Sequence, residues 1–547
     1  PYREEPLLLR DLTYWLNFRV HGAWAPGFTV VNLVLHGSCA AALYGVARRA
    51  FRRATKLSPG AAELAAFAGA LIFASHPLHV ESVNWISSRK DVLSLLFYLL
   101  AIRVWLDYLW AEGSASRNRL YLGCGALYVL ACLSKASVVS LPGILFMADL
   151  CLGPKRSWRD RVLALTPFAI WTLAFVKGYS SLLAAYDTLP EGNSVLESFP
   201  EGAPWYQTLI CTDLMALGLY LRDSFLPWYP RVFMRPPYAL GWSAEVASGL
   251  VVTSLGVGAA LFGAWRSPLL AWFGAWFFMA LVPFLNLLPT GIPYAPRYGF
   301  ISSGAASLLL GWALVALCGR LSRPARTRAL GVCLALWCGV AAAEVSSWSR
   351  AFTDPETLWL KVEAREPGRR HAAQGLGRVY GIQAERADPA RLEVLAARLE
   401  GLLTTTNTLA ALGMVRERQG RLDDALALYK KTANAERGGS ALGFMLTARL
   451  LVERDAARGF PEKGEGDADP EWRQALKLYA YFAERWPGRA EEAHRKTAEV
   501  LQRAGRVEEA GAAWRVYLIQ HARTPTQRER ASAALEALQR GGPPPGD

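Results

Sequence analysis

The chain has 547 residues, 52% of them hydrophobic, with 20 tryptophans and a mean hydropathy of +0.15, which is too apolar for a typical soluble protein. Its net charge of +14 is compatible with a nucleic-acid-binding protein. Arginines in the loops of a membrane protein explain that charge more simply, so we expect no nucleic-acid partner. The eight cysteines lie in apolar segments and none forms a CxxC pair, which argues against a disulfide framework or a zinc site.

Apolar runs of roughly 17–22 residues, the length that a bilayer core requires, alternate with short charged or Pro/Gly-rich links up to residue 347. This pattern predicts a polytopic α-helical membrane domain over residues 1–347. The expected spans are residues 28–47, 60–75, 92–110, 120–134, 136–152, 162–180, 245–264, 268–287, 300–318 and 329–346.

Loop charges predict the orientation of these spans. The loops at 48–56, 155–161 and 320–328 are rich in Lys and Arg and are therefore expected to be cytoplasmic. The link 181–204 has no Lys or Arg and four carboxylates, which suits the external side. Residues 1–27 must then also be external, so we expect a further transmembrane helix before them.

One apolar segment, residues 205–226, contains Asp213, Arg222 and Asp223. If this segment crossed the membrane, the arginine-rich loop at 320–328 would become external. We therefore predict a helix that packs at the outer face without crossing.

The most polar segment between two apolar runs is His-Pro-Leu-His-Val-Glu-Ser-Val-Asn-Trp-Ile-Ser-Ser-Arg-Lys-Asp, residues 76–91. Such a segment cannot lie in hydrocarbon cheaply, so it is a candidate functional site at a membrane surface or in a polar cavity. Two interpretations of His76, His79 and Glu81 remain open. They can be metal ligands, although Pro77 interrupts the helix and no second ligand cluster appears, or they can bind sugar hydroxyls or cap the preceding span.

From residue 348 onward the long apolar runs stop and charges of both signs become dense. Residues 407–437 and 498–520 each read as two helices joined at a glycine, Gly420 or Gly505, and the first resembles a tetratricopeptide repeat. We expect about four such repeats over 348–547, with an irregular insert at 463–470. These arrays bind peptides or partner proteins, and packing support for the membrane domain is the alternative.

The loop sequence of residues 76–94 resembles that of the transmembrane-and-tetratricopeptide-repeat O-mannosyltransferases and their bacterial relatives, which are glycosyltransferases of the C superfamily. Further pieces agree with this family: Tyr2-Arg3 with Tyr14-Trp15-Leu16-Asn17, Gly27-Phe28 to His36, Leu133-Ser134-Lys135, and Pro296-Arg297-Tyr298. Two features depart from it. Pro296 stands where relatives often carry Asp, and the acidic pair of the first external loop would lie upstream of Tyr2.

The resemblance implies a polyprenyl-phosphate-linked, mannose-like sugar as donor and transfer to a protein or other hydroxyl on the external side. Such chemistry requires a carboxylate to take the acceptor proton and cations to stabilise the leaving phosphate. The catalytic candidates are Glu81 and Asp91. The candidates for binding substrate or lipid phosphate are His76, His79, Arg89, Lys90, Arg222, Arg297 and Tyr298, with Lys135, Arg231 and Arg235 as further external cations.

A second hypothesis is a non-catalytic relative that acts as an accessory or scaffold subunit of a membrane protein complex through its repeats. No cofactor is predicted apart from the open metal interpretation. Frequent Ala, Arg and Gly indicate a GC-rich bacterium, so we expect a bacterial inner membrane with the repeats in the periplasm.

Overall fold

The structure of the chain, a computed structural model, describes residues 7–55, 57–185, 205–226, 238–286, 292–434, 440–462, 469–522 and 524–540, together with residues 228, 232, 233, 236 and 464. Over these residues the fold is all-α and contains no strand, which confirms the predicted fold class. The chain divides into two compact units, residues 1–358 and 359–547. Each is described by itself.

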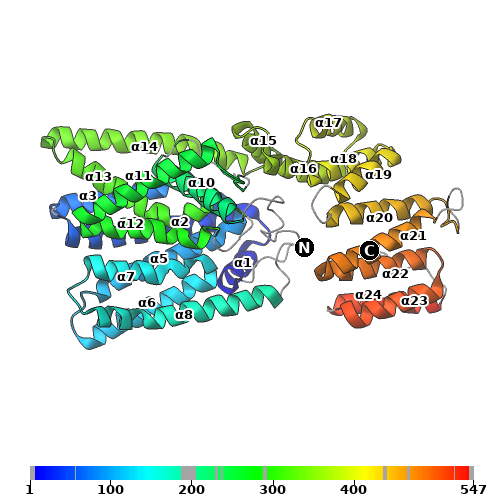
Figure 1. The fold of residues 1–547 in the computed structure, drawn as a ribbon, viewed down its shortest axis with the longest axis horizontal. Helices are drawn as coiled ribbons and strands as arrows, with labels where there is room; N and C mark the ends of the chain where they lie inside the picture. The colour runs from blue at the N-terminus through cyan, green and yellow to red at the C-terminus, as the bar shows by residue number, and fades with distance from the viewer. Residues whose placement is uncertain are drawn as a thin grey trace. The chain divides into compact units, whose positions relative to one another are not determined.

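Each of the ten expected spans coincides with a helix of the first unit (Figure 1). These helices are α2 (Ala25–Ala54), α3 (Pro59–Ser75), α5 (Arg89–Tyr108), α6 (Ser114–Ser134), α7 (Leu141–Leu152), α8 (Trp158–Ala185), α11 (Ala244–Arg266), α12 (Pro268–Leu281), α13 (Ser302–Cys318) and α14 (Arg323–Ala351). By length and composition, α2, α8, α11 and α14 can each cross a membrane alone, and α3 with the segment after it forms a fifth candidate bent by 44°. Residues 136–152, 268–284 and 302–318 form shorter apolar helices.

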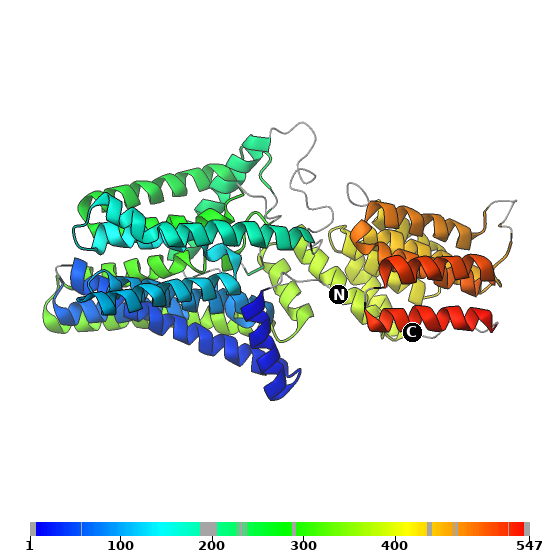
Figure 2. The ribbon, with the colours of Figure 1, turned by 90° about the horizontal axis from the view of Figure 1, so that it is seen from below.

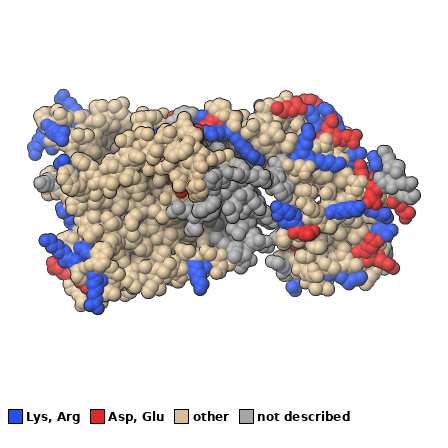
Figure 3. Space-filling model, in the orientation of Figure 1, with Lys and Arg blue, Asp and Glu red and all other residues tan. Residues whose placement is uncertain are grey.

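The surface of the first unit matches this arrangement. Figure 3 shows a broad band without charged side chains over the helices and Lys and Arg gathered at one end of the bundle, on the left of the view. A band of this kind is what contact with hydrocarbon requires, with the basic loops at the membrane surface.

Helix α10 (Trp205–Phe225) runs in the same direction as α11. Residues 214 and 215 touch Gly249, and Leu221 touches Gly256 seven residues further along α11. Between the two helices the chain passes Glu81, to which the backbone N–H of Phe233 donates at 3.5 Å, and then Thr212, to which that of Ala239 donates at 2.9 Å. The link thus returns along α10 to the end where that helix began.

Two glycines set the contact between α3 and α13. A Cβ on Gly311 would lie 2.3 Å from the backbone nitrogen of Gly69, so the two backbones meet with no side chain between them. Small residues allow such close packing of membrane helices, where dispersion rather than the hydrophobic effect drives association. Because α3 ends just before His76 and α13 begins just after Arg297, this contact positions two of the loops that form the site.

Helix α1 (Leu8–His21) was not predicted, since this stretch was interpreted as an external loop. It lies across the direction of the bundle (Figures 1 and 2). Its polar residues Arg10 and Asn17 are buried against the protein, whereas Trp15 and Phe18 are 56% and 57% exposed. Polar residues inside and aromatic residues outside are expected of a helix that faces lipid.

The second unit consists of helical repeats. Its helices are α16 (Arg370–Ala384), α17 (Pro389–Glu400), α18 (Thr406–Arg418), α19 (Leu422–Ala433), α20 (Ala441–Ala456), α21 (Glu471–Arg485), α22 (Ala490–Arg503), α23 (Val507–Val516) and α24 (Pro525–Gln539), preceded by α15 (Pro355–Arg365) at the junction of the units. Most of the predicted insert at 463–470 lies outside the described residues.

The two glycines predicted at repeat turns have the same role. Gly420 follows α18 with φ +78° and Gly505 follows α22 with φ +70°, a left-handed conformation that glycine adopts without strain. After each, a backbone N–H reaches back to close the helix end, from Arg421 to the carbonyl of Arg416 and from Arg506 to that of Leu501, at 2.9 Å in both cases. The recurrence of this turn supports the helix-pair interpretation.

Candidate functional site

The candidate site forms where four interruptions of the helices meet at one end of the first unit. After α3 come η1 (Pro77–His79), α4 (Val80–Asn84) and η2 (Ile86–Ser88), and the other three interruptions are η3 (Ala136–Ser140), η4 (Val282–Phe284) and η5 (Pro296–Gly299). Proline stands in the first turn of η1, η4 and η5, where it cannot continue a preceding α-helix. Short helices that follow such breaks expose backbone and polar groups at membrane depth, which is tolerated only inside protein.

Glu81 and Arg297 form a buried ion pair between the first and the last of these loops. Glu81 is fully buried, and its second carboxylate oxygen receives the long bond from the N–H of Phe233. The Arg297 guanidinium lies 5.3 Å from the ring centre of Trp85 and 5.0 Å from that of Tyr298. The pair is thus desolvated and surrounded by aromatic rings, which favours a fixed geometry.

Asp91 and Lys135 form a second buried ion pair. Lys135 bonds one carboxylate oxygen of Asp91, and the other, Oδ2, has no hydrogen-bond partner among the described residues. A buried carboxylate oxygen without a partner is costly unless something else occupies the site. Of the two candidate catalytic carboxylates, Asp91 is therefore the one with an oxygen available to accept a proton.

Tyr298 connects the two ion pairs. Its ring centre is 5.0 Å from Arg297 and 5.7 Å from the Lys135 amine, and it stacks on Phe284 at 4.3 Å. The structure therefore brings together five of the residues that the sequence singled out, Glu81, Asp91, Lys135, Arg297 and Tyr298.

The histidines of the loop are buried and hydrogen-bonded within the protein. His76 accepts from the N–H of Leu78 at 3.1 Å and donates to the carbonyl of Ser224 at 3.2 Å, and His79 lies 2.9 Å from the Ser303 hydroxyl. In the described part of the chain no group of three or more His, Cys, Asp or Glu side chains is arranged to hold a metal ion. The histidines thus tie the loop to α10 and α13.

Arg89 belongs to the scaffold in this structure. Its guanidinium donates to the side chains of Asn17 and Asn32, to the carbonyl of Phe28 at 2.8 Å and to that of Thr13 at 3.3 Å. These four acceptors fix α1 and α2 on the loop. A lipid phosphate would have to displace some of these bonds, so the predicted phosphate contact for Arg89 finds no support in the geometry.

Arg222 lies near the end of α10 and is paired with Asp223, which also accepts from the hydroxyl of Tyr294 at 2.5 Å. Arg222 is the most accessible paired cation of the site, with 33% of its side chain exposed. Lys90 is half-buried beside the scaffold arginine. Of the remaining residues that the sequence proposed for this side, Tyr2, Arg3, Arg231 and Arg235 lie outside the described part of the chain.

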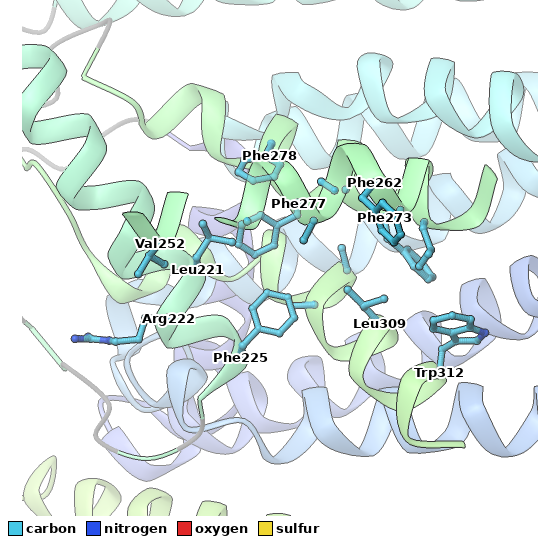
Figure 4. Close-up of a pocket in the computed structure, with 18 of the residues that line it drawn as sticks. Leu221, Arg222, Phe225, Val252, Phe262, Phe273, Phe277, Phe278, Leu309 and Trp312 are labelled. Atoms are coloured by element: carbon cyan, nitrogen blue, oxygen red, sulfur yellow. The ribbon is translucent and has the colours of Figure 1, made fainter. Parts of the chain in front are cut away.

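An apolar cavity of about 600 Å³ begins at Arg222 (Figure 4). It runs between α10, α11, α12 and α13, past Phe225 and Phe277, to Trp312 at its far end. Among the described residues that line it, Arg222 alone is charged. From Leu270 to Phe278 the wall follows α12 for eight steps, which is a rise of about 12 Å at 1.5 Å per residue. Sequence reasoning missed this cavity because its lining comes from four separate helices.

The comparisons with known proteins agree with the resemblance seen in the loop. The chain is 38% identical over 122 residues to the protein O-mannosyl-transferase Tmtc2 of Drosophila melanogaster, a match that covers 22% of this chain and 12% of the relative. It is 36% identical over 102 residues to TMTC4 of Mus musculus, covering 17% of this chain and 13% of the relative, and 28% identical over 156 residues to Tmtc3 of Drosophila melanogaster, covering 26% and 17%. No family model and no solved structure matches the chain.

The matched segments thus span less than a fifth of the length of these curated relatives. Within that limit the predicted resemblance is confirmed: over about a fifth of its length, the chain is similar to the transmembrane-and-tetratricopeptide-repeat protein O-mannosyltransferases.

Proposed function

We propose that the chain is a membrane glycosyltransferase that moves a mannose-like sugar from a polyprenyl phosphate to a hydroxyl group of a protein. The observation that carries the proposal is the apolar cavity that begins at Arg222. The next two residues of the chain belong to the site, because the carboxylate of Asp223 accepts from Tyr294 and the carbonyl of Ser224 accepts from His76. A lipid with an anionic head and a long hydrocarbon chain fits a cavity with one cation at its entrance and aromatic walls beyond.

The reaction breaks the bond between the sugar C1 and the phosphate oxygen and forms a bond between C1 and the acceptor oxygen. The acceptor proton passes to a carboxylate, for which Oδ2 of Asp91 is available. The lipid phosphate leaves with both electrons of the broken bond, and Arg222, Arg297 and Lys135 are the cations that can stabilise it. Glu81 holds Arg297 in place.

A binding experiment tests this assignment on the full chain in detergent. Arg222→Gln removes a charge-assisted contact worth about 1.5–3 kcal/mol, so the affinity for a polyprenyl phosphate should fall on the order of 10- to 100-fold. Ala259→Phe fills the cavity and should have a similar effect, whereas Ala247→Phe, on the same helix and outside the cavity, should have none. If Arg222→Gln and Ala259→Phe bind the lipid as well as the control Ala247→Phe does, the cavity is not the donor site.

We propose that sugar transfer takes place on the external side of a bacterial inner membrane and that the repeats lie in the periplasm. It is supported by the path of the chain after α10, which returns to the end where that helix began. Single cysteines on a cysteine-free background, at positions 194 and 462, should be labelled from the same, non-cytoplasmic face. Labelling from opposite faces would mean that α10 crosses the membrane.

A scaffold role is the second candidate, and one observation favours it. Glu81 and Asp91 are each neutralised by a cation of the protein itself, as in a purely structural charge network. A full chain that binds no polyprenyl phosphate, yet is recovered in a stable complex with another membrane protein, would favour this role over the enzyme.

A further inference from the structure

A second cavity lies at the opposite end of the helices that carry the site. α5 begins at Arg89, beside the ion pairs, and ends at Tyr108, while α6 begins at Ser114 and ends at Ser134, next to Lys135. The 20 residues of α5 measure about 30 Å, which is the thickness of the hydrocarbon core of a bilayer. The second cavity, of about 750 Å³, lies where α5 ends and where α6 and α8 begin.

The lining of this cavity is polar and carries a net positive charge. Arg117, Lys155 and Arg156 contribute three cations and Asp160 one carboxylate. Arg156 forms an ion pair with the fully buried Asp149 at 3.1 Å.

Neither of the other two cations forms an ion pair with a carboxylate among the described residues, although the charge of Arg117 acts on Asp149 from a distance. Arg117 lies 5.1 Å from the ring centre of Tyr108, and Lys155 has no ion-pair or hydrogen-bond partner among the residues that the structure describes. Cations in a concave site that no described carboxylate contacts directly favour an anionic ligand.

The cavity adjoins a surface that suits hydrocarbon chains. Leu163 lines it and is exposed, and the exposed apolar face of α8 continues from there through Ile170 and Leu173. Trp158, at the start of α8, is 65% exposed, as is typical of residues at a membrane interface. A phosphate bound among the cations would therefore have lipid-facing surface directly beside it.

We propose that this cavity binds the phosphate of an anionic phospholipid in the leaflet opposite the sugar-transfer site. A basic pocket between membrane helices is a recognised form of headgroup site. The adjoining apolar face of α8 favours a lipid over a soluble phosphate compound, which would use the cations and leave that face unused.

The test uses the full chain in detergent, with phosphatidylglycerol, phosphatidylcholine and inorganic phosphate as probes and the thermal unfolding midpoint as the readout. Phosphatidylglycerol should raise the midpoint and phosphatidylcholine should not. In Arg117→Gln/Lys155→Gln the apparent affinity for phosphatidylglycerol should fall on the order of 10-fold or more. The matched control is Arg320→Gln/Arg323→Gln, which removes the same charge from another basic loop of this unit, outside the cavity.

Three results would overturn the proposal: no response to phosphatidylglycerol, an equal loss in the control variant, or an equal response to inorganic phosphate. The last would assign the cavity to soluble phosphate compounds. If the double variant unfolds without lipid, Lys155→Gln alone replaces it, because Lys155 is exposed and has no hydrogen bond or ion pair with the residues that the structure describes.

Discussion

Variants of the Glu81–Arg297 pair should distinguish the contribution of the pair to the stability of the fold from its contribution to sugar transfer. Both residues are buried, so Arg297→Gln leaves a carboxylate in the interior whose only other described hydrogen bond is the long one from Phe233. Removing one partner of a buried pair typically costs about 3–5 kcal/mol. Glu81→Gln should cost less, because Trp85 and Tyr298 remain around the cation.

The double variant Glu81→Gln/Arg297→Gln places two neutral amides where two charges were. Replacing both partners of a buried pair is often close to neutral, so we expect most of the stability to return and a coupling energy of about 3 kcal/mol. The assay is reversible unfolding in mixed micelles, followed by circular dichroism, for the wild type and all three variants. Additive effects, with a coupling below about 0.5 kcal/mol, would refute the buried pair.

Sugar transfer in the same four proteins then reports on function. If Arg297 only holds the fold, the double variant should recover transfer along with stability. If the guanidinium also stabilises the leaving phosphate, transfer should stay reduced on the order of 100-fold in the refolded double variant. A double variant that is stable and fully active would remove Arg297 from the mechanism.

Three further outcomes are expected. Gly311→Ala should strongly lower the unfolding midpoint, because its Cβ would meet the backbone of α3, while Gly125→Ala, with open space around it, should leave the midpoint unchanged or raise it slightly. Residues 354–539 expressed alone should show strong helical circular dichroism and a cooperative melt, and a disordered fragment would show that the repeats need the membrane unit. In that fragment the bond from Arg503 holds the pKa of Glu453 below its ordinary value of 4.5. The stabilisation it gives is therefore complete above about pH 4.5 and lost as the pH falls through the lower folded-state pKa, so Glu453→Gln should reduce the acid sensitivity of the melting temperature.

Much of the fold could be predicted because its signals are local. A run such as 245–264 is apolar by itself, and Gly420 and Gly505 mark turns by their own backbone preference. Helix α1 was not predicted because its local pattern was misleading. Arg10 and Asn17 face the protein while Leu8, Trp15 and Phe18 face outward, which is the reverse of the pattern expected for a helix at the surface of a soluble protein.

The site could be predicted only as a set of residues. The sequence singled out Glu81, Asp91, Lys135 and Arg297, but their pairing joins positions 216 and 44 residues apart, and no local pattern contains it. Arg89 shows how tertiary partners escape the sequence. Its charge suggested a phosphate ligand, whereas the fold surrounds it with backbone carbonyls and asparagine side chains.

Helix α1 has a consequence for where the reaction takes place. The hydroxyl of Tyr14 donates to the carbonyl of Ile86 at 2.6 Å, so the loop that leads to Asp91 is fastened to a helix that exposes Trp15 and Phe18. We expect such a helix to lie at the boundary between headgroups and acyl chains. We therefore expect α1 to hold Asp91 at the level where a membrane lipid presents its phosphate.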